Sequence, residues 1–129
     1  MVGRLYPVGF LIDAISLREN SQVAYSPVRG TIRQVTVSWP DGCYFLVEVL
    51  VRKGKIQIYP AQVLGTGLPE GIALNNYTLT TALNHPVGED DILEVVAINH
   101  DSTFDHKISA VLLIEEEAEA TQEQVIPAS

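Results

Sequence analysis

Few features of this sequence point directly to a function, and several common ones are missing. The chain of 129 residues has a single cysteine, Cys43, so no disulfide can form within it. Its apolar runs are short (residues 47–51 are already interrupted by Glu48), whereas a membrane-spanning helix needs about 20 apolar residues. Its eight Lys and Arg residues, against 16 Asp and Glu, form no stripe that would neutralise phosphates. We therefore expect neither nucleic acid nor a membrane among its partners.

The beginning of the chain also lacks the pattern of a signal peptide. Arg4 precedes an apolar run at residues 8–12, but Asp13 interrupts this run and no cleavage site with small residues follows. We interpret this segment as the first strand. We expect the protein to stay in a reducing cytoplasm, with Cys43 as a small buried apolar residue.

The chain does contain enough apolar side chains for one packed domain. Hydrophobic residues make up 47% of it and charged residues 19%, a balance typical of a globular body and not of a disordered chain. Negative charge gathers at the end: five of the 16 acidic residues lie within residues 115–129, which contain no Lys or Arg. We predict a single domain over residues 1–115 and a solvated acidic tail over residues 116–129.

The apolar residues recur with the period of a strand, and no helical period is present. Turns rich in Gly, Pro, Asn and Asp separate the apolar stretches. The predicted strands cover residues 8–17, 30–39, 43–52, 55–59, 77–83, 92–98 and 108–114, with a further short edge strand near residues 23–25.

Two pairs of these strands are predicted to form hairpins. Pro40-Asp41-Gly42 supplies a turn between strands 30–39 and 43–52. Strands 92–98 and 108–114 are joined by a polar loop and are apolar on both faces. A strand that is apolar on both faces is covered on both sides, so this second hairpin should lie inside a sandwich or at a subunit contact.

Seven or eight short strands of this kind predict an antiparallel β-sandwich. The long connections at residues 18–29 and 60–76 favour a jelly roll over an immunoglobulin sandwich. The Cys…Trp…Cys arrangement of immunoglobulin domains is also missing.

Candidate metal ligands gather in one loop, but their pattern is not that of a known metal site. His100, Asp101, Asp105 and His106 lie close in sequence, and His85 could reach the same end of a sandwich. Asn, Asp and His also serve loops by hydrogen bonding to the backbone. We therefore predict neither a metal nor another cofactor, and keep a small metal enzyme on the three histidines as the least favoured hypothesis.

Catalytic signatures are equally weak. The serines lack the context of a nucleophile elbow, and no histidine lies near Cys43 in sequence. We predict that the protein is not an enzyme.

Binding through exposed aromatic rings is the alternative function that the sequence allows. Trp39 and Tyr59 lie beside turns, where their rings could face a ligand together with His100 and Phe104 of the polar loop. This arrangement would suit a carbohydrate- or receptor-binding module of a tail fibre or a cell-surface protein.

Association with other chains is the function that the apolar strands favour. The strands that are apolar on both faces carry more apolar surface than a lone sandwich of this size can bury, which indicates a protein interface and most simply a symmetric homo-oligomer. The side chains that we expect at an oligomer or capsid interface are Tyr44, Leu46, Leu50, Val111 and Leu113.

A resemblance to a known group supports this preference. The strand–PDG–strand unit, IQIYP, GIALNNYTLT and V-x-x-D-D-x-L-E-V over residues 30–115 resemble small jelly-roll virion proteins of tailed bacteriophages, of the capsid decoration (cement) and head-spike type. The resemblance implies a non-enzymatic virion protein, commonly trimeric, that clamps neighbouring subunits of a major capsid protein. It transfers no functional residue. An arm at residues 1–7 or 118–129 would then thread onto a neighbour.

Overall fold

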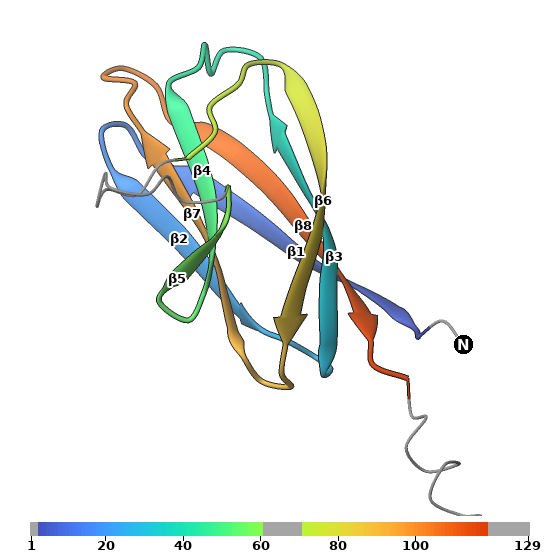
Figure 1. The fold of residues 1–129 in the computed structure, drawn as a ribbon. Coiled ribbons are helices and arrows are strands. Elements are labelled where there is room, and N and C mark those ends of the chain that lie inside the picture. Colours follow the sequence, from blue (N-terminus) through green and yellow to red (C-terminus); the bar gives the residue numbers. More distant parts are fainter. Residues whose placement is uncertain (1–2, 61–70, 119–129) are drawn as a thin grey trace, which may run out of the picture.

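The computed structural model describes residues 3–60 and 71–118, and folds them into two antiparallel four-stranded sheets (Figure 1). Among these residues, no helix is long and apolar enough to cross a membrane. The strands are β1 (Leu5–Ala14), β2 (Glu19–Tyr25), β3 (Gly30–Trp39), β4 (Val47–Lys53), β5 (Ile56–Tyr59), β6 (Tyr77–Val87), β7 (Ile92–Asn99) and β8 (His106–Glu116).

The strand order is that of a jelly roll. One sheet has the order β1-β8-β3-β6 and the other the order β2-β7-β4-β5. The strands pair as if one long hairpin had been rolled up: β1 with β8, β2 with β7, β3 with β6, and β4 with β5. Two further pairings, β3 with β8 and β4 with β7, complete the sheets. The predicted all-β sandwich is confirmed, and its eight strands have the double-sheet arrangement of jelly rolls.

Both predicted hairpins are wrong. β3 and β4 lie in different sheets, and so do β7 and β8, so each connection crosses from one sheet to the other. The turn that follows Trp39 does not fold back, because Tyr44 and Phe45 adopt positive φ values and residues 43–46 are not extended. Within the described chain, β4 and β5 are the only neighbours in sequence that are also neighbours in a sheet.

Two strands continue through a proline that lies beyond the end of the predicted strand. β1 begins at Leu5 and contains Pro7, so part of the proposed arm at residues 1–7 is a strand paired with β8. β6 continues to Val87 through Pro86, where a turn was expected. Both prolines are tolerated because β1 and β6 are edge strands, which leave one row of backbone groups unpaired.

Parts of two predicted segments fall outside the described residues. These are the acidic tail from residue 119 onward and most of the connection at 60–76. Of the predicted tail, Glu116 is the last residue of β8, and the Glu117 carboxylate lies 3.3 Å from Arg29 Nε. The predicted edge strand at 23–25 is confirmed and begins earlier, at Glu19.

The core lies between the sheets and is built largely from alternate residues of the strands. Trp39 joins the two layers, because its indole Nε1 donates a hydrogen bond of 2.9 Å to the carbonyl oxygen of Val47. The largest fully buried apolar side chains of the core cluster are those of Trp39, Ile32, Leu93, Ile108, Leu112 and Ile114. Leu50 and Val96, which are opposite each other on β4 and β7, are also fully buried although they do not belong to this cluster.

We expect neighbouring leucines of β8 to differ sharply in their contribution to stability. Leu112 is fully buried, and Leu→Ala at such a site costs about 3 kcal/mol through lost transfer energy and a residual cavity. Leu113 points to the outer face and is only half-buried, so Leu113→Ala should cost much less. Urea unfolding of both variants checks this, and equal losses would contradict the assigned faces.

Candidate functional site

Four connections meet at one end of the sandwich, at the top of Figure 1. They are residues 15–18 between β1 and β2, residues 40–46 between β3 and β4, residues 71–76 before β6, and residues 100–105 between β7 and β8. We call this end the loop end. It combines the polar loop singled out in the sequence with exposed aromatic rings, and it is the candidate functional site.

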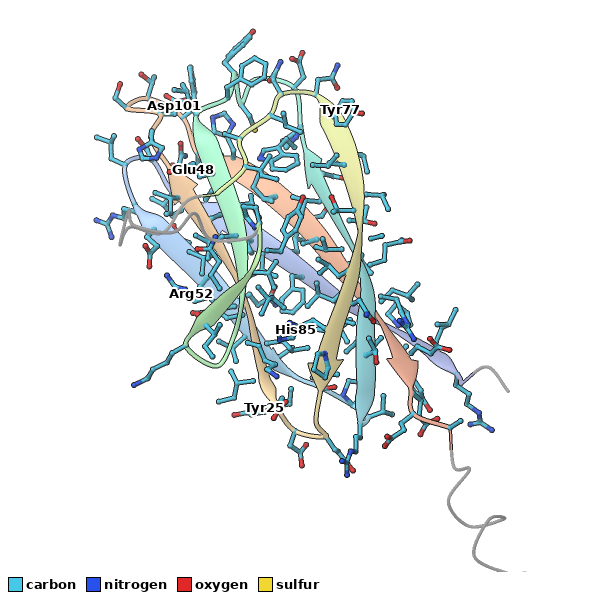
Figure 2. The ribbon with its side chains drawn as sticks, in the orientation of Figure 1. Tyr25, Glu48, Arg52, Tyr77, His85 and Asp101 are labelled. Atoms are coloured by element: carbon cyan, nitrogen blue, oxygen red, sulfur yellow. The ribbon has the colours of Figure 1, made fainter. Side chains whose placement is uncertain are left out.

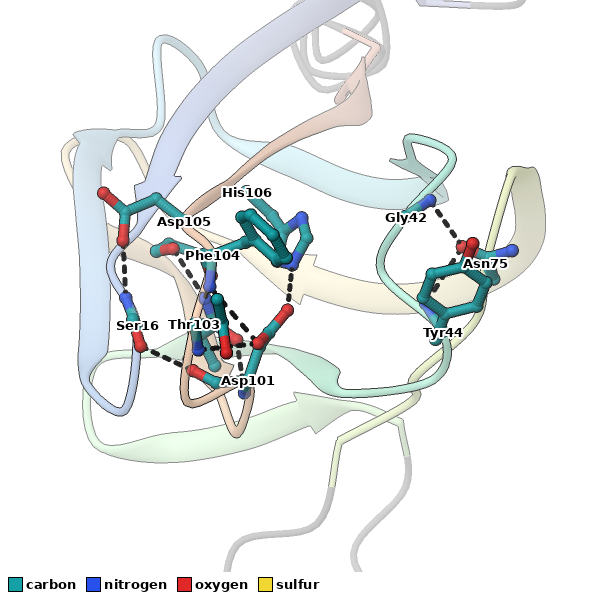
Figure 3. A network of polar contacts seen from close by, with 11 residues as sticks. Ser16, Gly42, Tyr44, Asn75, Asp101, Thr103, Phe104, Asp105 and His106 are labelled. Carbon is teal, nitrogen blue, oxygen red and sulfur yellow. Dashed lines mark hydrogen bonds and ion pairs between the residues drawn. The ribbon is translucent and has the colours of Figure 1, made fainter.

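Asp101 organises the connection between β7 and β8 (Figure 3). Its Oδ1 accepts hydrogen bonds from the backbone N–H groups of Thr103 (2.8 Å) and Phe104 (3.2 Å). Its Oδ2 lies 2.9 Å from His106 Nε2, and both side chains are nearly buried. The hydrogen bond with His106, supported by that from Thr103, lowers the pKa of Asp101. A carboxylate in this position fixes the whole loop.

Asn99 and Ser16 tie this loop to the turn between β1 and β2. The Asn99 amide donates to the carbonyl oxygens of Ala14 (2.8 Å) and Phe104 (3.0 Å). The Ser16 hydroxyl donates to the carbonyl oxygen of Asp101 (2.6 Å), and the Ser16 N–H donates to Asp105 Oδ1 (2.8 Å). Two loops that are far apart in sequence therefore form one rigid unit.

Asn75 holds the connection between β3 and β4 in the same way. Its Oδ1 accepts from the N–H groups of Gly42 (3.0 Å) and Tyr44 (2.9 Å), as Figure 3 shows. On the other side, the His100 N–H donates to the carbonyl oxygen of Leu46 (2.8 Å). Residues 40–46 are thus fixed between residues 71–76 and residues 100–105.

Three large apolar residues at the loop end adopt left-handed backbone conformations. Leu17, Tyr44 and Phe45 have φ values of 57°, 46° and 64°, and their exposed fractions are 65%, 66% and 64%. This conformation costs roughly 1–2 kcal/mol per residue that carries a Cβ. Strain held at exposed apolar side chains is an indication of function, because stability alone favours Gly or Asn there.

Sequence reasoning missed these backbone conformations. Tyr44 and Phe45 lie in an apolar run that reads as a strand, so their turn was assigned to strand 43–52. The available signal was Pro40-Asp41-Gly42 directly before them. The large apolar side chains that are exposed at the loop end or beside it are Leu17, Tyr44, Phe45, Leu46, Tyr77 and Phe104.

The residues expected to face a ligand divide into two groups. Phe104 is exposed at the loop end, and so is His100, whose Nε2 lies 2.7 Å from Glu48 Oε2. The expected exposure of Trp39 and Tyr59 is wrong, since they are only 2% and 3% exposed. Both rings fill the core, and the Tyr59 hydroxyl lies 3.1 Å from Thr81 Oγ1.

The residues expected at an interface do not share one surface. Val111 and Leu113 point outward from β8, in the sheet β1-β8-β3-β6. Tyr44 and Leu46 are exposed at the loop end, on the connection before β4. Leu50 is fully buried within the chain, so it is not available for a contact in this structure.

The three histidines occupy separate places. Figure 2 shows His85 towards the end opposite Asp101, and burial, followed by the charge of Lys53, lowers its pKa. Among the described residues, no group of three or more His, Cys, Asp or Glu could hold a metal ion. The hypothesis of one metal site on His85, His100 and His106 is therefore wrong.

Cys43 lies at the loop end but is not placed to act as a nucleophile. Its side chain is fully buried. Burial, followed by the charges of Asp101 and Asp41, raises the pKa of the thiol, so the reactive thiolate is disfavoured. It is a packed apolar residue, as the sequence predicts.

A cleft of about 770 Å³ lies at the opposite end, but several of its charged groups already have partners within the chain. Arg33 Nε donates to Glu115 Oε1 (2.7 Å), which lowers the pKa of Glu115, and Lys53 Nζ donates to the carbonyl oxygen of Pro86 (3.0 Å). Comparison of the chain with protein-family models and with curated proteins finds no match. The loop end, with its exposed aromatic rings, is the stronger candidate site.

We expect Asp101 to make the stability of the fold depend on acid. Because the folded protein holds the Asp101 pKa below the unfolded value of about 3.9, this contribution is present above that value and is lost as pH falls through the folded pKa. Asp101→Asn should lower the Tm at pH 7 and flatten its decrease in acid. Asp13→Asn, at an exposed carboxylate 3.9 Å from Lys107, is the control. Equal slopes in all three proteins would contradict this role.

We expect Phe45→Gly to stabilise the protein. Glycine removes the left-handed cost and adds a smaller entropic cost, for a net gain of about 0.5–1 kcal/mol. Ile56→Gly is the matched control, because Ile56 is equally exposed and has no positive φ, and it should destabilise. Urea unfolding distinguishes the two, and a loss of stability in Phe45→Gly would show that the conformation is not strained.

Proposed function

We propose that this chain is a non-enzymatic structural subunit that associates with itself and decorates a phage capsid. The observation that carries the proposal is the outer face of the sheet β1-β8-β3-β6, which presents no charged side chain over its central rows. The jelly-roll strand order and the resemblance of residues 30–115 to decoration proteins agree with it.

The strand register arranges this outer face in rows across all four strands. Asp13 and Lys107 lie beyond the rows at one end, and Glu115 lies beyond them at the other. The three rows between them are Leu11, Ser109, Ser38 and Thr78; Gly9, Val111, Thr36 and Thr80; and Pro7, Leu113, Gln34 and Ala82. We call these twelve residues the uncharged face.

Four of the five hydroxyl groups on the uncharged face are hydrogen-bonded to each other. Thr36 Oγ1 lies 3.1 Å from Thr80 Oγ1, and Ser38 Oγ lies 2.8 Å from Thr78 Oγ1. Polar groups that are hydrogen-bonded within the chain can be buried against another surface without losing a partner. The face can therefore be covered at a low cost in desolvation.

Charge favours a second copy of the chain as the partner of this face. The chain has a net charge of −8, so two copies repel over most surfaces. Uncharged faces that converge on a common symmetry axis bring no like charges together. The outer face of the other sheet differs, because Glu48, Arg52 and Glu94 lie on it at β4 and β7. A trimer, the size that the resemblance implies, would then bind the major capsid protein at several points of a lattice.

We expect light scattering to give a concentration-independent trimer for the wild-type chain. Val111→Lys places a charge at the centre of the uncharged face and should yield monomers, because an unpaired charge is costly to bury. Val23→Lys, on exposed β2 in the other sheet, is the matched control and should stay trimeric. A wild-type monomer at all concentrations, or a trimeric Val111→Lys variant, would refute self-association through this face.

A further inference from the structure

We propose that the loop end binds a neutral carbohydrate, a ligand that the proposed assembly function does not include. The site is formed by the rings of Tyr44, Phe45 and Tyr77, which we call the aromatic rim, with the polar side chains of Asp41 and Asn76 beside them. All five side chains are exposed.

The parts of this site are adjacent because two segments are bound together. Asn75 accepts from the N–H groups of Gly42 and Tyr44, and its own amide donates to Asp41 Oδ1 (3.5 Å). The Asn76 N–H donates to the carbonyl oxygen of Pro40 (3.3 Å). Asp41, Tyr44, Asn76 and Tyr77 thus come from segments that lie side by side.

Rings and polar groups in this arrangement match the two kinds of surface on a sugar. The C–H face of a pyranose stacks on an aromatic ring, and its hydroxyl groups need planar donors and acceptors at the edge of that ring. Small-ligand sites typically combine aromatic side chains with a few placed polar groups of this kind. The Asp41 carboxylate accepts hydrogen bonds, the Asn76 amide donates and accepts, and the tyrosine hydroxyls do both.

The charge of the loop end selects a neutral ligand. Arg18 is the only Lys or Arg in the four connections, whereas Asp41, Asp101 and Asp105 are acidic. A sulfated, phosphorylated or sialylated ligand would meet more negative than positive charge there. The same deficit opposes an anionic lipid surface.

A protein partner fits this surface less well. The centre of a protein interface is depleted of charged residues. Here Asp41 is exposed beside the rings, and the His100–Glu48 pair lies beside Leu46. A dry contact would bury these charges, whereas sugar hydroxyls can donate to them.

The backbone of the site is fixed before any ligand arrives. Asn75 holds the turn that contains Tyr44 and Phe45, because its Oδ1 accepts from the N–H groups of Gly42 and Tyr44. A rigid site loses little conformational entropy on binding. The strained backbone of Tyr44 and Phe45 directs their side chains outward in one defined direction, which suits a binding site.

A glycan array that contains neutral and acidic glycans, probed with the purified full-length chain, tests the proposal. Wild type should bind neutral glycans. Calorimetry with the strongest neutral glycan should then show at least a tenfold loss of affinity in Tyr44→Ser and in Phe45→Ser. Ile56→Ser is the matched control, because Ile56 is as exposed as Tyr44 but lies in the β4–β5 hairpin, and it should bind as wild type does (Figure 1).

Several results would overturn the proposal. These are no binding of wild type to any neutral glycan, binding to acidic glycans alone, or unchanged affinity in both serine variants. Cosedimentation with phosphatidylcholine vesicles that depends on Phe45 would also overturn it, in favour of a lipid surface. The solution mass of both serine variants should equal that of wild type, so that failure here leaves self-association through the uncharged face intact.

Discussion

The pairing of β8 with β1 on one side and β3 on the other is the interaction on which the rest of the structure depends. It joins residues 5–14 to residues 106–115 and closes the roll. Side chains alternate along β8, so Ile108, Ala110, Leu112 and Ile114 enter the core while Ser109, Val111 and Leu113 face outward. A slip of one residue would exchange these two sets. Core packing therefore fixes the uncharged face as well.

The sequence predicts what is local in this fold and fails where distant residues decide. Alternation identifies β3 over residues 30–39 without error, because a strand's two faces are read from neighbouring residues. It cannot show which strands pair. β7 and β8 are both apolar and consecutive, yet each pairs only with strands distant in sequence, so the hairpin that their pattern favours is absent. Rolling a long hairpin separates neighbours in sequence into different sheets.

The candidate site was predictable to a similar degree. The polar loop around Asp101 indicated a structured turn, and Phe104 and His100 lie on it as expected. The positions of Trp39 and Tyr59 beside turns could not reveal that their rings point inward, since that depends on the facing sheet. The left-handed conformation of Tyr44 could not be predicted either, because Asn75, about thirty residues away, accepts the hydrogen bond from the Tyr44 N–H.

The two proposed surfaces lie on different parts of one rigid body, and this separation has a consequence for binding strength. The uncharged face belongs to the sheet β1-β8-β3-β6, whereas Tyr44 and Phe45 of the aromatic rim lie on the connection before β4, outside this sheet. The proposed self-association through the face would therefore leave these two rings uncovered in each protomer. A trimer would then present three rims at fixed spacing. A sugar site of low affinity gains several orders of magnitude when such copies bind one glycan-rich surface together, so oligomerisation would supply the avidity that a single exposed rim lacks.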